Sequence, residues 1–203
     1  MTKTLNYYEE SANELSARYE SARLDHFYQA LRQFFLPGAR LLEIGCGSGR
    51  DAAKIVGEGY QVEAVDGSEN LLANALRLHP ELDGHLHHIR LPAKLPFSDH
   101  EFDGFYSVAC LMHFSNEEVA EILVELNRVL KPGGRGLVSV PAGRDDVSHD
   151  GLDEHGRVFN LLPAPAWIEV FQQQGFRARP GNEEPDGAGR EGISWISYFL
   201  ERF

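Results

Sequence analysis

The chain has 203 residues, enough for one domain with a substantial core, because a domain of this size buries about 70% of the surface of its unfolded chain. Its formal charge of −12, from 19 Lys and Arg against 31 Asp and Glu, opposes long-range attraction to nucleic acid or anionic lipid. Two cysteines, Cys46 and Cys110, are too few for a disulfide framework. The N-terminus lacks the apolar segment of a signal peptide, so we expect a cytoplasmic protein without a membrane partner.

Residues 11–35 carry apolar side chains at helical spacing, which predicts one or two helices that end at Pro37-Gly38. An apolar strand, Leu41–Ile44, then runs into a glycine-rich turn that contains Gly45, Gly47 and Gly49. Glycines at alternate positions allow positive φ and leave no Cβ between the main chain and a ligand. The free amides of the helix that follows point at the same place. The pattern predicts a cofactor site at this turn.

The spacing of the turn separates two classes of cofactor. A dinucleotide fingerprint requires a third glycine where this chain has Arg50. Asp66, 21 residues beyond Gly45, ends a second apolar run, where a carboxylate is placed to accept both hydroxyls of a ribose. These features favour a nucleoside-bearing ligand without a pyrophosphate over NAD.

The rest of the chain alternates predicted strands and helices. A helix opens at Ser68, and a second opens at the capping box of Ser115 and Glu118. Residues 141–160 are polar and punctuated by glycines, which predicts a long loop that is either a substrate lid or a solvated connection. A helix near 164–174 and a hairpin follow it. The predicted strands are 62–65, 85–91, one that begins at 102, 135–140, 176–179 and 193–200, with a turn-rich stretch at 180–190.

Four motifs in order resemble those of the class I S-adenosylmethionine-dependent methyltransferases. They are Glu43–Gly49, Asp66, Leu95-Pro96-Phe97 with Glu101–Gly104, and Leu126–Gly134. The resemblance covers roughly residues 36–140. It implies an α/β fold with one Rossmann-like, doubly wound sheet, mostly parallel with an antiparallel C-terminal strand, and helices on both faces. The implied cofactor is S-adenosyl-L-methionine.

The resemblance also implies how a single domain, 1–203, is divided. We expect a helical cap in 1–36, a cofactor-binding core in 37–141, a substrate lid in 142–160 and a C-terminal helix and hairpin in 161–203. Tyr7, Tyr8 and Tyr19 either pack on the surface or close over the cofactor, where a cation-π contact favours the sulfonium. Tyr19 and Arg23, one turn apart on a helix face, are the candidates for that closing contact.

The implied cofactor-binding residues come from the cap, the glycine turn and the ends of three strands. Leu91 stands where relatives often have an acid for the adenine amino group, so backbone groups near Pro92 and Ala93 are expected to replace it. The full set is Tyr19, Arg23, Glu43, Gly45, Cys46, Gly47, Gly49, Arg50, Asp51, Asp66, Gly67, Ser68, Pro92, Ala93, Ser107 and Val108.

Methyl transfer requires no nucleophilic side chain from the protein, because a sulfonium methyl is already electrophilic. The protein mainly has to hold the acceptor's nucleophilic atom in line with the C–S bond. His113 is either the group that accepts a proton, since its unperturbed pKa of about 6.5 suits neutral pH, or a packing residue. In the long loop, His149, His155 and Arg157 are candidate substrate contacts. The histidine spacings match no standard metal site.

We therefore predict a methyltransferase for a small-molecule acceptor, with no nucleic-acid partner and with monomer and homodimer both left open. Two other classes remain as alternatives. A noncatalytic protein would bind S-adenosylmethionine with the same fold, and an NAD-linked oxidoreductase would need the glycine that Arg50 replaces.

Overall fold

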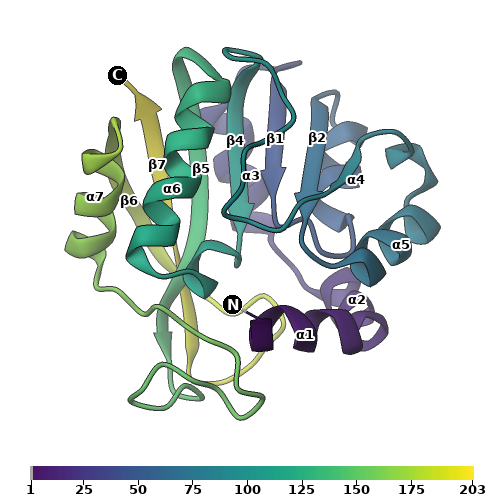
Figure 1. Ribbon diagram of the computed structural model, residues 1–203, viewed down its shortest axis with the longest axis vertical. Helices are drawn as coiled ribbons and strands as arrows, with labels where there is room; N and C mark the ends of the chain where they lie inside the picture. Colours follow the sequence, from purple (N-terminus) through teal and green to yellow (C-terminus); the bar gives the residue numbers. More distant parts are fainter. Residues whose placement is uncertain (1) are drawn as a thin grey trace.

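The computed structural model describes residues 2–203, which form a seven-stranded sheet in the order β3-β2-β1-β4-β5-β7-β6 (Figure 1). Strands β1 to β5 run parallel, and β7 is antiparallel to both β5 and β6. The predicted mostly parallel, doubly wound sheet is confirmed. Its strands are β1 Arg40–Ile44, β2 Gln61–Asp66, β3 Leu86–His88, β4 Phe102–Val108, β5 Leu130–Arg144, β6 Phe176–Pro185 and β7 Ile193–Arg202.

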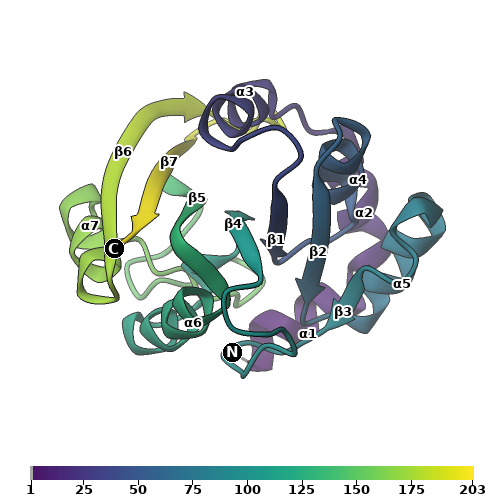
Figure 2. The ribbon, with the colours of Figure 1, turned by 90° about the horizontal axis from the view of Figure 1, so that it is seen from above.

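Helices cover both faces of the sheet (Figure 2). The side chains of α3 and α4 pack with Leu41 and Val62 on one face. Those of α6 and α7 pack with Leu42 and Ile44 on the other, because successive strand residues point to opposite faces. The helices are α1 Thr2–Glu10, α2 Ala12–Ser21, α3 Asp25–Phe34, α4 Arg50–Gly57, α5 Glu69–Leu78, α6 Asn116–Val129 and α7 Ala164–Gln173, with short 3₁₀ turns at Pro80–Leu82 and Leu111–His113.

Two helix starts follow their predicted caps. The Ser68 hydroxyl accepts a hydrogen bond from the Leu71 amide at the start of α5. At the start of α6, Ser115 and Glu118 form the reciprocal bonds of a capping box. These bonds satisfy amide groups that lack partners within the helix, so the sequence alone places both starts.

The strands of the C-terminal half are longer than predicted. β5 continues to Arg144, which pairs with Ile193, and a bulge between Pro141 and Gly143 absorbs the irregular residues. β6 continues to Pro185 because Glu183 and Glu184 pair with β7. Cross-strand hydrogen bonding here overrides turn-forming residues. β3, in contrast, is only three residues long.

The carboxyl ends of β1, β2, β4 and β5 meet at one edge of the sheet. In Figure 1, α1, α2 and the loop 145–163 lie below the arrowheads at this edge. The Val158 amide donates to the Thr4 hydroxyl at 3.0 Å, which joins the loop to α1. The N-terminal helices α1 and α2 and the loop 145–163 therefore cover the edge where open α/β sheets bind ligands.

No helix within residues 2–203 is both long enough and apolar enough to span a membrane.

Candidate functional site

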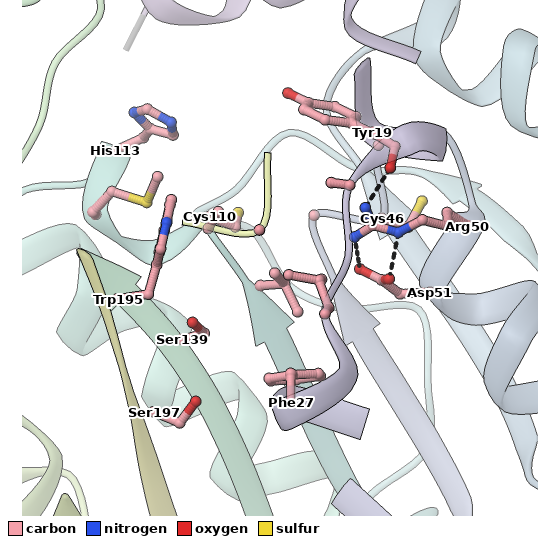
Figure 3. A pocket seen from close by; sticks show the side chains of 18 of the residues that line it. Tyr19, Phe27, Cys46, Arg50, Asp51, Cys110, His113, Ser139, Trp195 and Ser197 are labelled. Atoms are coloured by element: carbon pink, nitrogen blue, oxygen red, sulfur yellow. Dashed lines mark hydrogen bonds and ion pairs between the residues drawn. The ribbon is translucent and has the colours of Figure 1, made fainter. Parts of the chain in front are cut away.

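A cavity of about 680 Å³ opens at the carboxyl edge of the sheet (Figure 3). The glycine turn and Asp66 line one end, and Tyr8, His113 and Arg157 line the other. Its volume lies within the range of roughly 300–1,000 Å³ that is usual for small-ligand sites. One continuous space therefore joins the residues predicted for the cofactor to two of those predicted for chemistry and substrate.

The glycine turn brings bare main chain to the cavity wall. Gly45 and Gly47 have φ of +76° and +54°, a region that favours glycine. A Cβ at Gly45 would lie 2.5 Å from Cys110 Sγ, and a Cβ at Gly47 would lie 3.2 Å from the Tyr19 ring. Gly49, predicted to bind the cofactor, lies instead against α5, where a Cβ would meet Ala75 at 3.0 Å. Its role is to let the turn pack closely.

Asp66 is held by two main-chain amides at the end of β2. Gly47 N–H donates to Oδ2 at 2.8 Å, and Ser68 N–H donates to Oδ1 at 2.9 Å. Burial raises the pKa of Asp66, while these hydrogen bonds oppose the rise. Each carboxylate oxygen has further lone pairs, so Asp66 can still accept two ligand hydroxyls. Ser68 itself caps α5 and bonds to Glu9, and it lies outside the cavity wall.

Arg50 and Asp51 line the cavity and also clamp the N-terminal helices onto the glycine turn. Arg50 donates to both oxygens of Asp51, at 2.8 and 2.9 Å, and its Nη1 donates to the Tyr19 carbonyl. Asp51 also accepts the hydroxyl of Tyr28 from α3. Figure 3 draws the Arg50 bonds beside the Tyr19 ring. The clamp holds that ring above Gly47, in the place predicted for a lid.

Arg23 does not share a helix face with Tyr19, so that prediction is wrong. α2 ends at Ser21, and the Arg23 side chain is 84% exposed and pairs with Asp25 at 3.3 Å. The Arg23 amide donates to the carbonyl of Gly187 in the β6–β7 loop at 2.9 Å. Arg23 therefore lies at the mouth of the cavity, where the N-terminal segment meets the C-terminal hairpin.

Four further predicted residues lie outside the cavity wall. Glu43 is buried behind the turn, where it accepts the Tyr106 hydroxyl at 3.0 Å, and burial together with the nearby Asp51 charge raises its pKa well above the ordinary value. Ser107 donates to the Ile44 carbonyl at 3.1 Å and so joins β4 to β1. The wall after β3 consists of Ile89, Arg90 and Leu91, and it ends before Pro92 and Ala93.

The end of β4 forms the floor of the cavity. Val108, Ala109 and Cys110 line it, and Ala109 has a φ of +55°, which is uncommon for a residue other than glycine. Burial raises the pKa of the thiols of Cys46 and Cys110 well above their ordinary value. Both cysteines are therefore protonated packing residues at neutral pH.

His113 is buried, and both of its ring nitrogens are engaged. Its Nδ1 lies 2.6 Å from the Val158 carbonyl, which only accepts, so Nδ1 carries the proton. Its Nε2 then accepts the Tyr8 hydroxyl at 2.7 Å. The pKa of His113 is lowered to about 4, mainly by burial and also by the charges of Arg157 and Arg144, while the bond to Val158 opposes the shift. The unperturbed pKa of about 6.5, on which the proton-accepting role was based, therefore does not apply to the buried ring, which is neutral at pH 7.

Arg157 joins the loop 145–163 to α1. Its Nε donates to Asp153 Oδ2 at 2.8 Å, and its Nη2 forms an ion pair with the same oxygen at 2.6 Å. Its Nη1 donates to the Tyr8 oxygen at 3.3 Å. Burial raises the pKa of Tyr8, so its phenol stays protonated and has a hydrogen to donate to His113. Tyr8, His113 and Arg157 thus form one hydrogen-bonded group on the cavity wall.

His149 and His155, predicted as substrate contacts, are exposed and lie outside the cavity wall. Asp153 accepts hydrogen bonds from the main-chain amides of His155 and Arg157. These bonds fold the loop so that the side chain of Arg157 faces the cavity. The His155 ring stacks on the ring of Tyr7, with centroids 4.6 Å apart. Within residues 2–203, no group of three or more histidine, cysteine or acidic side chains is arranged to hold a metal ion.

Several wall residues were not identified from the sequence as site residues. Arg144, Phe159 and Trp195 line the substrate end, and Phe27 lines the opposite wall (Figure 3 labels Phe27 and Trp195). Trp195 reaches the site through the pairing of β7 with β5, where it lies opposite Pro141. Pairing between distant strands leaves no spacing signal in the chain, so local motifs could not have found these residues.

The cavity wall differs in charge from the molecule as a whole. Although the chain carries a net charge of −12, the wall formed by the described residues has eight arginines and four carboxylates. The arginines are Arg18, Arg23, Arg50, Arg90, Arg144, Arg157, Arg179 and Arg190, and the carboxylates are Asp51, Asp66, Glu184 and Asp186.

Residues 42–138 match the family model described as "Methyltransferase domain". Phosphoethanolamine N-methyltransferase 2 of Caenorhabditis elegans is 36% identical over 109 residues, which are 52% of this chain and 24% of that protein. The 2-phytyl-1,4-naphtoquinone methyltransferase of Synechocystis sp. is 43% identical over 103 residues, or 48% of this chain and 42% of that one. The chain thus spans less than half the length of these two curated relatives.

A solved structure of a S-adenosylmethionine-dependent methyltransferase from Aquifex aeolicus superposes with a TM-score of 0.67. The superposition covers 96% of this chain and 98% of that one, at 19% identity, and it shows that the fold is shared. Glu43–Gly49 and Asp66 lie at the carboxyl ends of β1 and β2, Glu101–Gly104 leads into β4, and Leu126–Gly134 joins α6 to β5. S-adenosylmethionine is the cofactor of the family. The methyltransferase-domain match over residues 42–138 and the shared fold support a place for the chain in the class I S-adenosylmethionine-dependent methyltransferase family.

Proposed function

We propose that the chain is an enzyme that transfers a methyl group from S-adenosylmethionine to a small-molecule acceptor. The observation that carries the proposal is the continuous cavity, which extends from the glycine turn and Asp66 to Tyr8 and His113. A cofactor and an acceptor can lie side by side in such a space, as in-line transfer requires. Small-molecule acceptors are also named in the two curated relatives, a phosphoethanolamine and a naphthoquinone enzyme.

The residues at the glycine end fit the cofactor. Gly45 and Gly47 leave room for a ligand against the main chain, Asp66 offers two acceptor oxygens for ribose hydroxyls, and the Tyr19 ring covers the turn. When bound, S-adenosylmethionine supplies an electrophilic methyl group on a positively charged sulfur. Val108 and Cys110 line the neighbouring wall, where neutral side chains exclude water from the reacting atoms.

The substrate end would orient the acceptor rather than deprotonate it. His113 is neutral with a pKa of about 4, so it is a weak base at neutral pH, and its Nε2 is occupied by Tyr8. Tyr8 lines the cavity, and its hydroxyl donates to His113 and accepts from Arg157, so one lone pair of the oxygen is left for an acceptor. The role predicted for His113 therefore becomes a positioning role that acts through Tyr8.

Two measurements on the purified chain test the proposal. Calorimetric titration with S-adenosylhomocysteine and with NAD should give saturable binding of the first compound only. Transfer of labelled methyl groups should then be measured with a panel of small acids, amines, phenols and thiols. Binding of NAD alone would point to an oxidoreductase, and binding of S-adenosylhomocysteine without transfer to any acceptor would favour a noncatalytic binding protein.

A further inference from the structure

The substrate end of the cavity contains two buried guanidinium groups. Arg144 comes from the carboxyl end of β5, and Arg157 comes from the loop 145–163. Their side chains are 2% and 7% exposed, yet both line the cavity. The two Cζ atoms lie 4.1 and 5.3 Å from the centroid of one ring, that of Phe159. Two cations, one from the end of β5 and one from the loop that follows it, therefore converge on one place.

A carboxylate holds one edge of each guanidinium. Arg144 donates through Nε and Nη2 to Asp146. Arg157 donates through Nε to Asp153 and forms an ion pair with it through Nη2. Neither aspartate is part of the cavity wall, so the acids lie behind the arginines. Because a guanidinium is planar and rigid, fixing one edge also fixes the direction of the other.

The other edge of each guanidinium, which includes Nη1, has N–H groups that neither aspartate accepts. Among residues 2–203, Nη1 of Arg144 has no hydrogen-bond partner, and Nη1 of Arg157 has the Tyr8 oxygen at 3.3 Å, a long contact. Each Nη1 carries two N–H groups. Within the described part of the chain, Nη1 of Arg144 is not one of the fully buried side-chain atoms that lack a partner, so it is open to the cavity and can donate to a ligand that supplies acceptor oxygens.

The residues around Arg144 and Arg157 are also compatible with a bound anion. The charges of Arg157 and Arg144 lower the pKa of His113 and that of Asp153 raises it, so both guanidinium groups act on the same part of the cavity wall. Trp195 and Met112 line the cavity beside the arginines, and Trp195 Nε1 donates to Asp186 at 2.8 Å, which fixes the indole. Apolar surface therefore adjoins the charged donors.

We propose that the methyl acceptor is a small acid with an apolar body, and that Arg144 and Arg157 bind its carboxylate or phosphate group. Guanidinium groups match the paired oxygens of both anions. The inference rests on the proposed methyl transfer, because it concerns the acceptor in the same cavity.

Calorimetry on the protein saturated with S-adenosylhomocysteine tests the inference. The probes are 4-hydroxybenzoate for the carboxylate, phenyl phosphate for the phosphate, and neutral 4-hydroxybenzamide as the matched analogue. We expect one or both anions to bind at least about tenfold more tightly than the amide. The anion that binds more tightly identifies the group. Equal affinity for anions and amide, or no binding of either anion, overturns the inference.

Substitutions of single arginines show whether anion affinity depends on Arg144 or only on the net charge of the protein. Arg144→Gln should weaken anion binding about tenfold and leave amide binding unchanged. Arg177→Gln is the matched control, since it removes the same charge from a side chain that is 73% exposed and outside the cavity. If Arg144→Gln does not fold, Arg144→Lys keeps the charge, loses the fork and should still weaken anion binding. Unchanged anion affinity in the folded variant overturns the inference.

The first titration of this experiment distinguishes the two proposals. If S-adenosylhomocysteine itself does not bind, the proposed methyl transfer fails. If it binds and neither anion does, only the inference about the acceptor fails.

Discussion

Tyr8 and His113 are 105 positions apart in the chain, yet the Tyr8 hydroxyl donates to His113 Nε2 at 2.7 Å. The bond joins α1 to the turn after β4 and closes the substrate end of the cavity. It also fixes the histidine tautomer, because the Nδ1 proton is used by the Val158 carbonyl. The stability of the cap and the chemistry of the site therefore depend on the same pair.

Protonation of His113 should make the fold sensitive to acid. Its pKa is about 4 when folded, against about 6.5 when unfolded, so the unfolded chain binds the proton first as the pH falls. The free energy of unfolding should therefore fall through the window from 6.5 to 4. Between pH 7 and pH 5 we expect this residue to account for about 2 kcal/mol of the loss.

Urea denaturation of the wild type and His113→Asn at the two pH values measures this contribution as a difference. The variant should lose about 2 kcal/mol less than the wild type, since asparagine does not titrate. His149→Asn is the control, because His149 is exposed and should behave as the wild type does. Identical pH dependence in the wild type and His113→Asn would contradict the burial argument.

Removal of the Tyr8 hydroxyl should destabilise the cap and slow turnover. Tyr8→Phe leaves Nε2 of the buried His113 without a donor, at a cost of about 1–3 kcal/mol in the free energy of unfolding. Tyr7→Phe is the matched control, since Tyr7 contributes its ring to a stack with His155. Unfolding and methyl-transfer assays on both variants check the prediction. Equal effects of the two substitutions would show that the hydroxyl of Tyr8 has no special role.

The parts of the site predicted from the sequence are those encoded by contiguous residues. The glycine turn and Asp66 were found because a strand, a turn and an acid at a fixed distance form a local pattern. The sheet was predicted for the same reason, since alternating strands and helices with short connections permit few topologies. The capping box of Ser115 placed the start of α6 to the residue.

The substrate end could not be predicted in this way. Arg144 and Trp195 enter the cavity through the pairing of β5 with β7, and Tyr8 enters through the packing of α1. The low pKa of His113 depends on burial by those segments, which no local spacing reports. His149 and His155 share their loop with Arg157, but only the fold of the loop around Asp153 decides which side chain faces inward.

The glycine at the start of the turn should tolerate no side chain. Gly45→Ala forces alanine to a φ of +76°, which costs about 1–2 kcal/mol, and places its Cβ 2.5 Å from Cys110 Sγ. Gly45→Ala with Cys110→Ala should not restore the loss, because the Cβ of residue 110 would still lie 2.6 Å away.

Gly57→Ala serves as the control for this prediction. Gly57 is helical with open space around its Cα, so alanine there should be neutral or stabilise by about 0.5 kcal/mol. Thermal unfolding and titration with S-adenosylhomocysteine measure both effects. Wild-type stability and affinity in Gly45→Ala would show that the turn does not approach the β4 end as closely as the structure indicates.

The strongest single test of the cofactor site is Asp66→Asn, which keeps the shape of the side chain and removes its charge. Both carboxylate oxygens accept main-chain amides, so an asparagine NH₂ would face the N–H of either Gly47 or Ser68. The variant therefore loses an acceptor for the turn as well as one for a ribose hydroxyl. Each lost bond to a charged group is worth about 1.5–3 kcal/mol, so affinity for S-adenosylhomocysteine should fall at least tenfold. Asp83→Asn, at an exposed position beyond α5, removes the same charge and should bind as the wild type does. Equal calorimetric affinities for both variants would separate Asp66 from cofactor binding.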